Sequence, residues 1–90
     1  FKSKMQRQRY DDLKLAQTAG DVIMFLPEVP FRMPGTVYWA DFMVFWADGN
    51  VTVEDVKGVV TPTFKTKRRM MEIHYPSVKI ICINYKRTKK

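Results

Sequence analysis

The sequence of 90 residues has one cysteine, one histidine and no long apolar run. Cys82 has no second cysteine with which to form an internal disulfide, and the zinc sites that need several cysteines are excluded. It lies in the apolar run VKIICINY, so we expect it to be a buried small hydrophobe. His74 is the only histidine, so neither a Cys/His zinc site nor a Ser-His-Asp triad is supported.

Membrane and export signals are also missing. No segment approaches the roughly 18 apolar residues that a membrane-spanning helix needs, and no signal peptide is visible. We therefore expect an intracellular protein with no membrane partner. The chain begins with Phe1 rather than Met, so we expect natural residues to precede it.

Acidic residues are few: nine Asp and Glu face sixteen Lys and Arg, which gives a net charge of +7. Such a balance favours a polyanionic partner, with nucleic acid ahead of an anionic membrane surface. The hydrophobic fraction of 46% is enough for one core, so we expect a single domain over residues 1–90 that ends in a basic tail at 86–90.

A first helix is predicted over residues 3–19, which contain helix formers and no Pro or Gly. Ser3 is the expected N-cap, Gln6 its capping-box partner and Gly20 the C-terminal stop. The spacing of four apolar residues predicts a buried stripe. These are Met5, Tyr10, Leu13 and Ala16.

Three strands follow. Two prolines in residues 21–33 predict an edge strand or one with an irregular start. Residues 36–46 are rich in aromatic and β-branched side chains. The turn signal Asp48-Gly49 joins them to a returning strand over residues 50–58.

After a predicted turn at residues 59–63, residues 64–75 return to helical composition, and Pro76 ends this second helix. Residues 77–85 are the last strand. The expected fold is an α/β domain with the order helix-strand-strand-strand-helix-strand and a mixed sheet flanked by helices. The candidates for the buried stripe of the second helix are Phe64, Met71 and either Ile73 or His74.

Carboxylates interrupt the most strand-like segment, although strand interiors avoid Asp. Period-2 alternation places Asp55 and Lys57 on one face of the returning strand and Glu54 on the other. Pairing across the Asp48-Gly49 turn places Asp41 opposite residue 56 or 57. We therefore expect Asp41, Asp55 and Lys57 to meet on one rim.

Two carboxylates with a lysine suit phosphodiester hydrolysis. Their oxygens, with the carbonyl of Val56, can bind Mg²⁺ or Mn²⁺. Such a metal lowers the pKa of a bound water, and a lysine stabilises the developing charge. A surface ion pair between Asp55 and Lys57 is the alternative.

The segments ADF, DGN and VEDVKG, in this order, resemble the PD-(D/E)XK nuclease superfamily. FKSKMQRQRYDDLKLAQTAGDV and TPTFKTKRRMMEIHYP are similar to the two helices of a small phage-type branch linked with Holliday-junction resolvases. The resemblance covers nearly the whole chain. It implies a restriction-endonuclease-like core and a Mg²⁺- or Mn²⁺-dependent DNA endonuclease selective for branched DNA, in a phage or its bacterial host.

Carried over residue by residue, the resemblance implies that Asp41 and Asp55 are metal-binding acids and that Lys57 is the motif lysine. The family pattern has a Glu in the first helix where this sequence has Gln6. A neutral amide can accept a hydrogen bond but brings no charge. Either the natural protein tolerates Gln at this position, or a Glu was replaced to disable cleavage.

Basic residues on both helices are the expected phosphate contacts, and their alternative role is a solvated helix face. An aromatic outer face of Tyr38, Phe42 and Trp46 is our candidate surface for a homodimer, which cleavage of two strands would need. The main predicted DNA contacts are Lys65, Lys67, Arg68, Lys4 and Arg7, with further support from Lys2, Arg9, Arg69, Lys86, Arg87, Lys89 and Lys90.

Three other functions stay open on the sequence alone. A strand-nicking subunit of a transposase shares the same pattern. A DNA-binding module could keep the fold without the chemistry, and Gln6 favours this. A basic domain that binds RNA or protein would show no preference for branched DNA.

Overall fold

The computed structural model describes residues 3–85. It has six elements in the predicted order, so the α/β class with two helices and a mixed sheet is confirmed. The predicted phosphate contacts at Lys2 and in the tail at 86–90 lie outside the described residues. The elements are α1 (Lys4–Ala19), β1 (Val22–Met33), β2 (Thr36–Trp46), β3 (Val51–Val56), α2 (Pro62–His74) and β4 (Ile80–Ile83).

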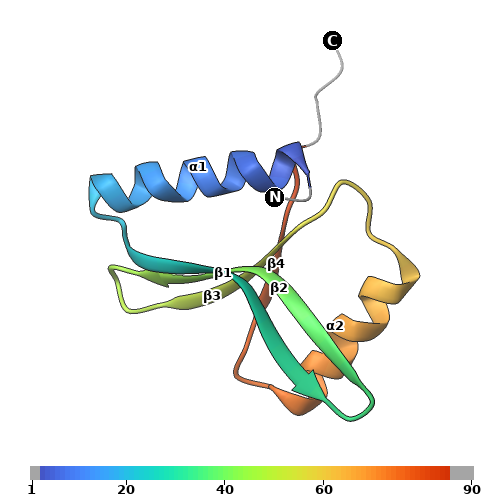
Figure 1. Ribbon diagram of the computed structural model, residues 1–90. Helices are drawn as coiled ribbons and strands as arrows, with labels where there is room; N and C mark the ends of the chain where they lie inside the picture. Colours follow the sequence, from blue (N-terminus) through green and yellow to red (C-terminus); the bar gives the residue numbers. More distant parts are fainter. Residues whose placement is uncertain (1–2, 86–90) are drawn as a thin grey trace.

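The four strands form one sheet in the order β1-β2-β3-β4. The pairs β1–β2 and β2–β3 are antiparallel, whereas β3 and β4 are parallel and joined through α2. Figure 1 shows α1 lying over one part of the sheet and α2 beside another part. β1 is an edge strand and its register shifts between Val22 and Met24, as its prolines led us to expect.

The ends of α1 follow the sequence signals. The side chain of Ser3 accepts a hydrogen bond from the backbone N–H of Gln6 (3.1 Å), and Gly20 ends the helix in the left-handed conformation with φ 91°. Leu13, at the centre of the predicted stripe, is buried, and its other three members are half-buried. The side chain of Gln6, expected to complete a capping box, extends to Asp41.

The second helix begins earlier than predicted. Thr61 is its N-cap and accepts a hydrogen bond from the N–H of Phe64 (3.2 Å), and Pro62 is the first helical residue. The predicted turn at residues 59–63 was therefore wrong at its end. Proline suits the first helical position because the missing N–H would have no partner there.

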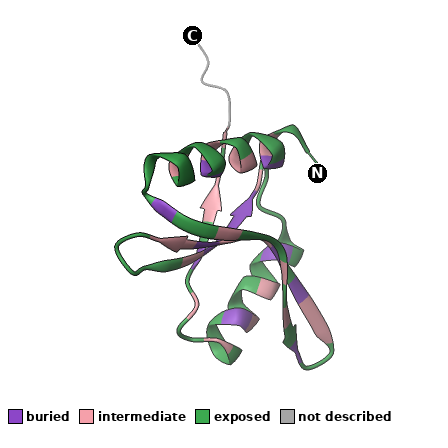
Figure 2. Ribbon diagram, turned by 60° about the vertical axis from the view of Figure 1, so that its left-hand side comes forward, coloured by how far each residue is buried: buried purple, intermediate pink, exposed green. Residues whose placement is uncertain are grey.

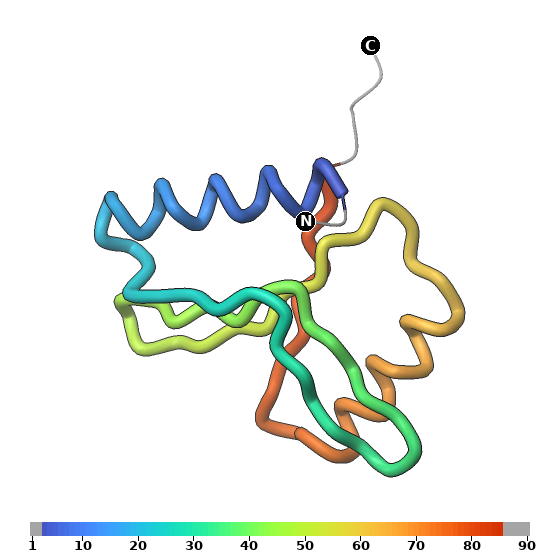
Figure 3. Tube along the Cα trace, in the orientation of Figure 1, coloured from blue at the N-terminus to red at the C-terminus, as the bar shows by residue number. Residues whose placement is uncertain are grey.

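The long hairpin of β1 and β2 is bent in its middle (Figure 3). Pro27 pairs with Phe42 and Val29 with Ala40. Between these two pairs, Glu28 adopts a positive φ of 52°, a conformation that is uncommon for residues other than glycine. One half of the hairpin therefore lies under α1, and the other half extends towards α2.

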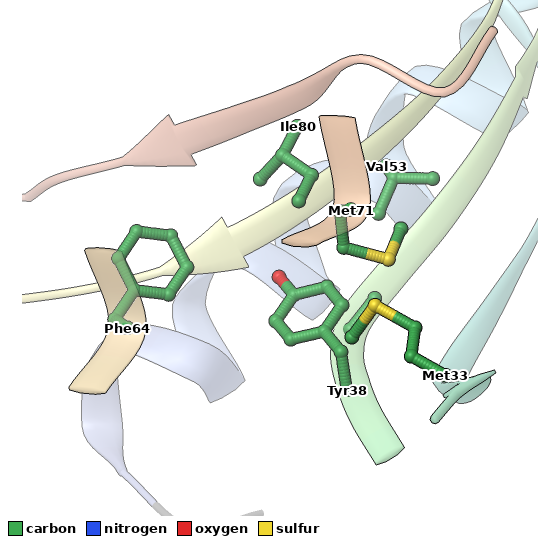
Figure 4. Close-up of a cluster of buried hydrophobic side chains, with 7 residues drawn as sticks. Met33, Tyr38, Val53, Phe64, Met71 and Ile80 are labelled. Atoms are coloured by element: carbon green, nitrogen blue, oxygen red, sulfur yellow. The ribbon is translucent and has the colours of Figure 1, made fainter. Parts of the chain in front are cut away.

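The buried residues of β2 alternate without interruption through this bend, but the helix that they face changes. Tyr38 and Ala40 belong to the core cluster beside α2, whereas Phe42 and Val44 belong to the cluster under α1. In a flat strand, all four would share one face. Figure 4 shows the ring of Tyr38 among core side chains on the α2 side. The outer faces of both helices are covered by exposed residues (Figure 2).

Several burial predictions were wrong. Tyr38 and Phe42, expected on an aromatic outer face, are 3% and 0% exposed, because each faces a helix. Ile73 (68% exposed) and His74 lie on the outer side of α2, two and three residues beyond the buried Met71. Cys82 is half-buried and its sulfur lies 3.8 Å from an Arg68 nitrogen.

The two helices within residues 3–85 are α1 and α2, and neither combines the length and the apolar character required to cross a bilayer.

Candidate active site

The candidate site lies where β2 and β3 separate. The pairing of Phe42 with Glu54 continues to place Asp41 opposite Asp55. We had predicted residue 56 or 57 as the partner opposite Asp41, and this was wrong. The turn is centred on Asp48 rather than between Asp48 and Gly49, so every pair of the hairpin is shifted. Asp41 is nevertheless bonded to the neighbouring residue, since its Oδ2 accepts the backbone N–H of Val56 at 2.7 Å.

Asp55 forms the floor of the site and is 3% exposed. Its Oδ2 accepts a hydrogen bond from the hydroxyl of Tyr38. Its Oδ1 lies 3.4 Å from Nζ of Lys57, whose side chain is 33% exposed. The Lys57 nitrogen also lies 4.9 Å from the centre of the Phe64 ring, so a cation–π contact holds the lysine on the α2 side of Asp55.

Asp41 joins this site to α1. Its Oδ1 accepts a hydrogen bond from Nε2 of Gln6 at 2.9 Å, and Gln6 is 3% exposed. Burial raises the pKa of the Asp41 carboxyl above its ordinary value, and the nearby Asp55 raises it further, while the Val56 N–H and Lys57 oppose this. Asp55 is therefore close enough to disfavour the charged form of Asp41.

An open pocket of about 280 Å³ gives solvent access to these groups. Its walls come from β2, the end of β3 and the start of α2. The lining residues are Tyr38, Trp39, Asp41, Asp55, Lys57, Thr61, Thr63, Phe64 and Lys67.

The oxygens of this site fit a hard divalent cation. An ionised carboxylate offers about four lone-pair positions, and the hydrogen bonds above leave some of them unused on Asp41 and Asp55. Within residues 3–85, no group of three His, Cys, Asp or Glu side chains could hold a metal. The third member of the cluster is Gln6, whose amide is neutral.

The structure separates the five predicted DNA contacts. Lys67 lines the pocket, and its Nζ donates to the carbonyl of Val37 at 3.3 Å. Lys65 and Arg68 line a separate hollow on the exposed side of α2. Lys4 and Arg7 are exposed on the first turn of α1, where Arg7 also forms an ion pair with Asp11 (3.5 Å).

Arg9, expected among the phosphate contacts, binds the protein itself. It forms two hydrogen bonds of 2.7 and 2.6 Å with the carboxylate of Glu54, which is 2% exposed. This bond raises the pKa of Arg9. Glu54 points towards α1 and away from Asp55, as alternation predicted. Arg9 is therefore a structural residue.

Sequence reasoning missed three residues of the pocket. Tyr38 binds Asp55, Phe64 lies under Lys57, and Trp39 lines the pocket with 55% of its surface exposed. The contact of Tyr38 with Asp55 depends on the bend of β2. The only sequence signal for that bend is the pair of prolines, Pro27 and Pro30, on the neighbouring strand.

Comparisons with known proteins give a family but no activity. No curated protein matches the chain, and neither does any solved structure. A family model described as "Protein of unknown function (DUF1064)" matches residues 1–89. The chain therefore belongs to the DUF1064 family, and the cluster of Asp41, Asp55 and Lys57 lies within the matched region.

Proposed function

We propose that the protein is a metal-dependent DNA endonuclease with a restriction-endonuclease-like core, acting on branched DNA. The observation that carries this proposal is the meeting of Asp41 and Asp55 at the point where their strands separate, with Lys57 3.4 Å from Asp55. Two acids and a lysine in an open pocket are the groups that metal-assisted hydrolysis of a phosphodiester needs.

Asp41, Asp55 and the carbonyl of Val56 would hold Mg²⁺ or Mn²⁺. When bound, the metal would supply a water of lowered pKa and neutralise charge on the phosphate. Tyr38 and Gln6 fix the two carboxylates through hydrogen bonds, one to each. Preorganised groups of this kind cost no rearrangement when the reaction occurs.

Lys57 would orient the attacking water or stabilise negative charge that develops on the phosphate. Its contact with Phe64 and its ion pair with Asp55 hold the ammonium group beside the acids. Lys67 lines the same pocket and could contact a phosphate next to the one that is cut.

A second candidate is a DNA-binding module without cleavage, and the contact between Gln6 and Asp41 favours it. Because the amide of Gln6 donates to Oδ1 of Asp41, this carboxylate has a hydrogen-bond donor in the absence of a metal. A Glu at this position would place a third carboxylate beside Asp41 and would create a need for a cation.

The deciding experiment is cleavage of a labelled four-way junction and a matched linear duplex in Mg²⁺ or Mn²⁺. The unsubstituted chain, Gln6→Glu, and Gln6→Glu combined with Asp41→Ala are compared. We expect Gln6→Glu to cut the junction and the added Asp41→Ala to reduce the rate at least about 10³-fold, as loss of an essential charged group does.

Folding is checked for each variant by circular dichroism. If no variant cuts any DNA, yet all bind it equally well with EDTA present, the acids have no catalytic role and the binding module is correct.

A further inference from the structure

Trp39 is an unexpected member of the pocket. It is 55% exposed, and it lines the same pocket as Asp41 and Asp55. The rest of the lining is mainly acids, lysines and threonines. The core of this domain has buried sites for aromatic rings, so an exposed indole beside the candidate catalytic acids calls for a ligand with an apolar face.

A second apolar group lies next to the pocket in the chain. The loop after Lys57 carries Val59 (75% exposed) and Val60 (42% exposed), and it leads directly to Thr61 in the pocket wall. Trp39 on β2 is therefore the exposed apolar side chain of the pocket lining, and Val59 and Val60 precede the wall residue Thr61 in the chain without lining the pocket.

Continuous duplex DNA offers little to such residues. Its outer surface is sugar and phosphate, and the faces of its bases are covered by their neighbours. An unpaired base exposes its face, and stacking on an aromatic ring is a common way to bind it. Proteins that bind single strands combine such rings with cations that contact the backbone, and Lys67 supplies a cation in the same pocket.

We propose that the pocket takes DNA with unpaired nucleotides beside the cleaved phosphate, and that Trp39 stacks on one of those bases. This inference deepens the proposed function and rests on it. It narrows the substrate, because a splayed arm or flap has unpaired bases at the branch, whereas a fully paired four-way junction does not. The splayed DNA is the better ligand.

The test is DNA binding in EDTA, where cleavage cannot contribute. Labelled splayed-arm DNA with thymine arms and a blunt duplex of equal length are titrated with the unsubstituted chain, Trp39→Phe and Trp39→Ala. We expect Trp39→Ala to weaken binding of the splayed DNA about tenfold, Trp39→Phe to retain most of the affinity, and duplex binding to change less than about twofold.

Two further variants sharpen the test. Ile73→Ala removes an apolar side chain of similar exposure (68%) that lies on α2 and outside the pocket, so both affinities should stay unchanged. Trp46→Phe leaves Trp39 as the sole tryptophan of the chain. In that variant, an oligothymidylate should quench the fluorescence and the duplex should not.

Equal weakening of both DNAs by Trp39→Ala, or no weakening, overturns the stacking proposal. The outcome is separate from that of the cleavage experiment. If Trp39→Ala loses affinity for the splayed DNA alone, stacking is supported even when no variant cuts DNA. The absence of cleavage would then refute only the nuclease. If Gln6→Glu cuts DNA, and Trp39→Ala does not change the preference for splayed over duplex DNA, the stacking proposal is overturned and the nuclease proposal stands.

Discussion

Two adjacent acids on β3, Glu54 and Asp55, are equally buried at 2% and 3% exposure, yet their surroundings differ. Glu54 faces α1, where Arg9 neutralises it with two short hydrogen bonds. Asp55 faces the open pocket, with a tyrosine hydroxyl and a partly exposed lysine as partners and a second acid, Asp41, beside it.

The difference separates a structural acid from a candidate functional one. A buried charge is tolerated when a partner satisfies it fully, and Glu54 meets that condition within the protein. Asp55 and Asp41 share one lysine, Lys57. Incompletely compensated carboxylates in a pocket are a common mark of a binding or catalytic site. The comparison can be tested on both sides.

The largest effect is expected on the Glu54 side. Arg9→Ala leaves Glu54 buried without its cation, and loss of one partner of a buried pair costs about 3–5 kcal/mol. The free energy of unfolding, from urea denaturation at neutral pH, should fall by that amount.

Arg7→Ala is the matched control, two residues earlier on the same helix. It breaks an exposed ion pair with Asp11, whose two side chains are 65% and 58% exposed, and should cost less than about 1 kcal/mol. Equal losses in the two variants would show that the contact of Arg9 with Glu54 is not a structural link.

The next effect belongs to the Asp55 side and concerns metal. Gln6→Glu adds a third carboxylate beside Asp41, so the folded state should be less stable without metal and should bind Mg²⁺ more tightly. At a metal concentration of 100 times Kd, binding to the folded state adds about 2.7 kcal/mol. Thermal unfolding with Mg²⁺ and with EDTA measures this gain.

The unsubstituted chain, with Gln6, should gain less stability from the same Mg²⁺. A Glu54→Gln variant, altered on the other face of β3, should gain no more than the unsubstituted chain. If Gln6→Glu shows no larger gain than these two, the cluster around Asp41 is not a metal site.

Much of this arrangement could be predicted from local signals. The order of elements follows from apolar periodicity and the turn residues, and the ends of α1 follow from Ser3 and Gly20. Strand alternation correctly separates Glu54 from Asp55. The structure also brings Asp41, Asp55 and Lys57 together, because a hairpin fixes which residues face each other to within about one position.

The rest depends on contacts that local signals do not encode. The pairing of Arg9 with Glu54 requires knowing which face of α1 lies over β3. The contact of Tyr38 with Asp55 requires the bend at Glu28, which changes the helix that the buried residues of β2 face between Ala40 and Phe42. We placed Tyr38 on an outer face because a straight strand was assumed.

The smallest effect is a pH dependence at Asp41. Because burial and Asp55 raise the pKa of this carboxyl above its ordinary value of 3.8, the folded state keeps the proton to a higher pH than the unfolded state does. Between these two pKa values, the folded state binds more protons, so stability falls as pH rises. The Asp41→Asn variant has no carboxyl at this position and therefore does not lose this stability as pH rises. Its free energy of unfolding relative to the unsubstituted chain should therefore increase as pH rises from near 3.8, and then level off. Urea denaturation in EDTA at a series of pH values measures the difference.

Ile73→Ala is the control for this pH dependence. It removes no titratable group, so its difference in free energy of unfolding should stay constant with pH. A difference for Asp41→Asn that decreases as pH rises would mean that Val56 and Lys57 outweigh burial and Asp55, and that Asp41 is as fully satisfied as Glu54.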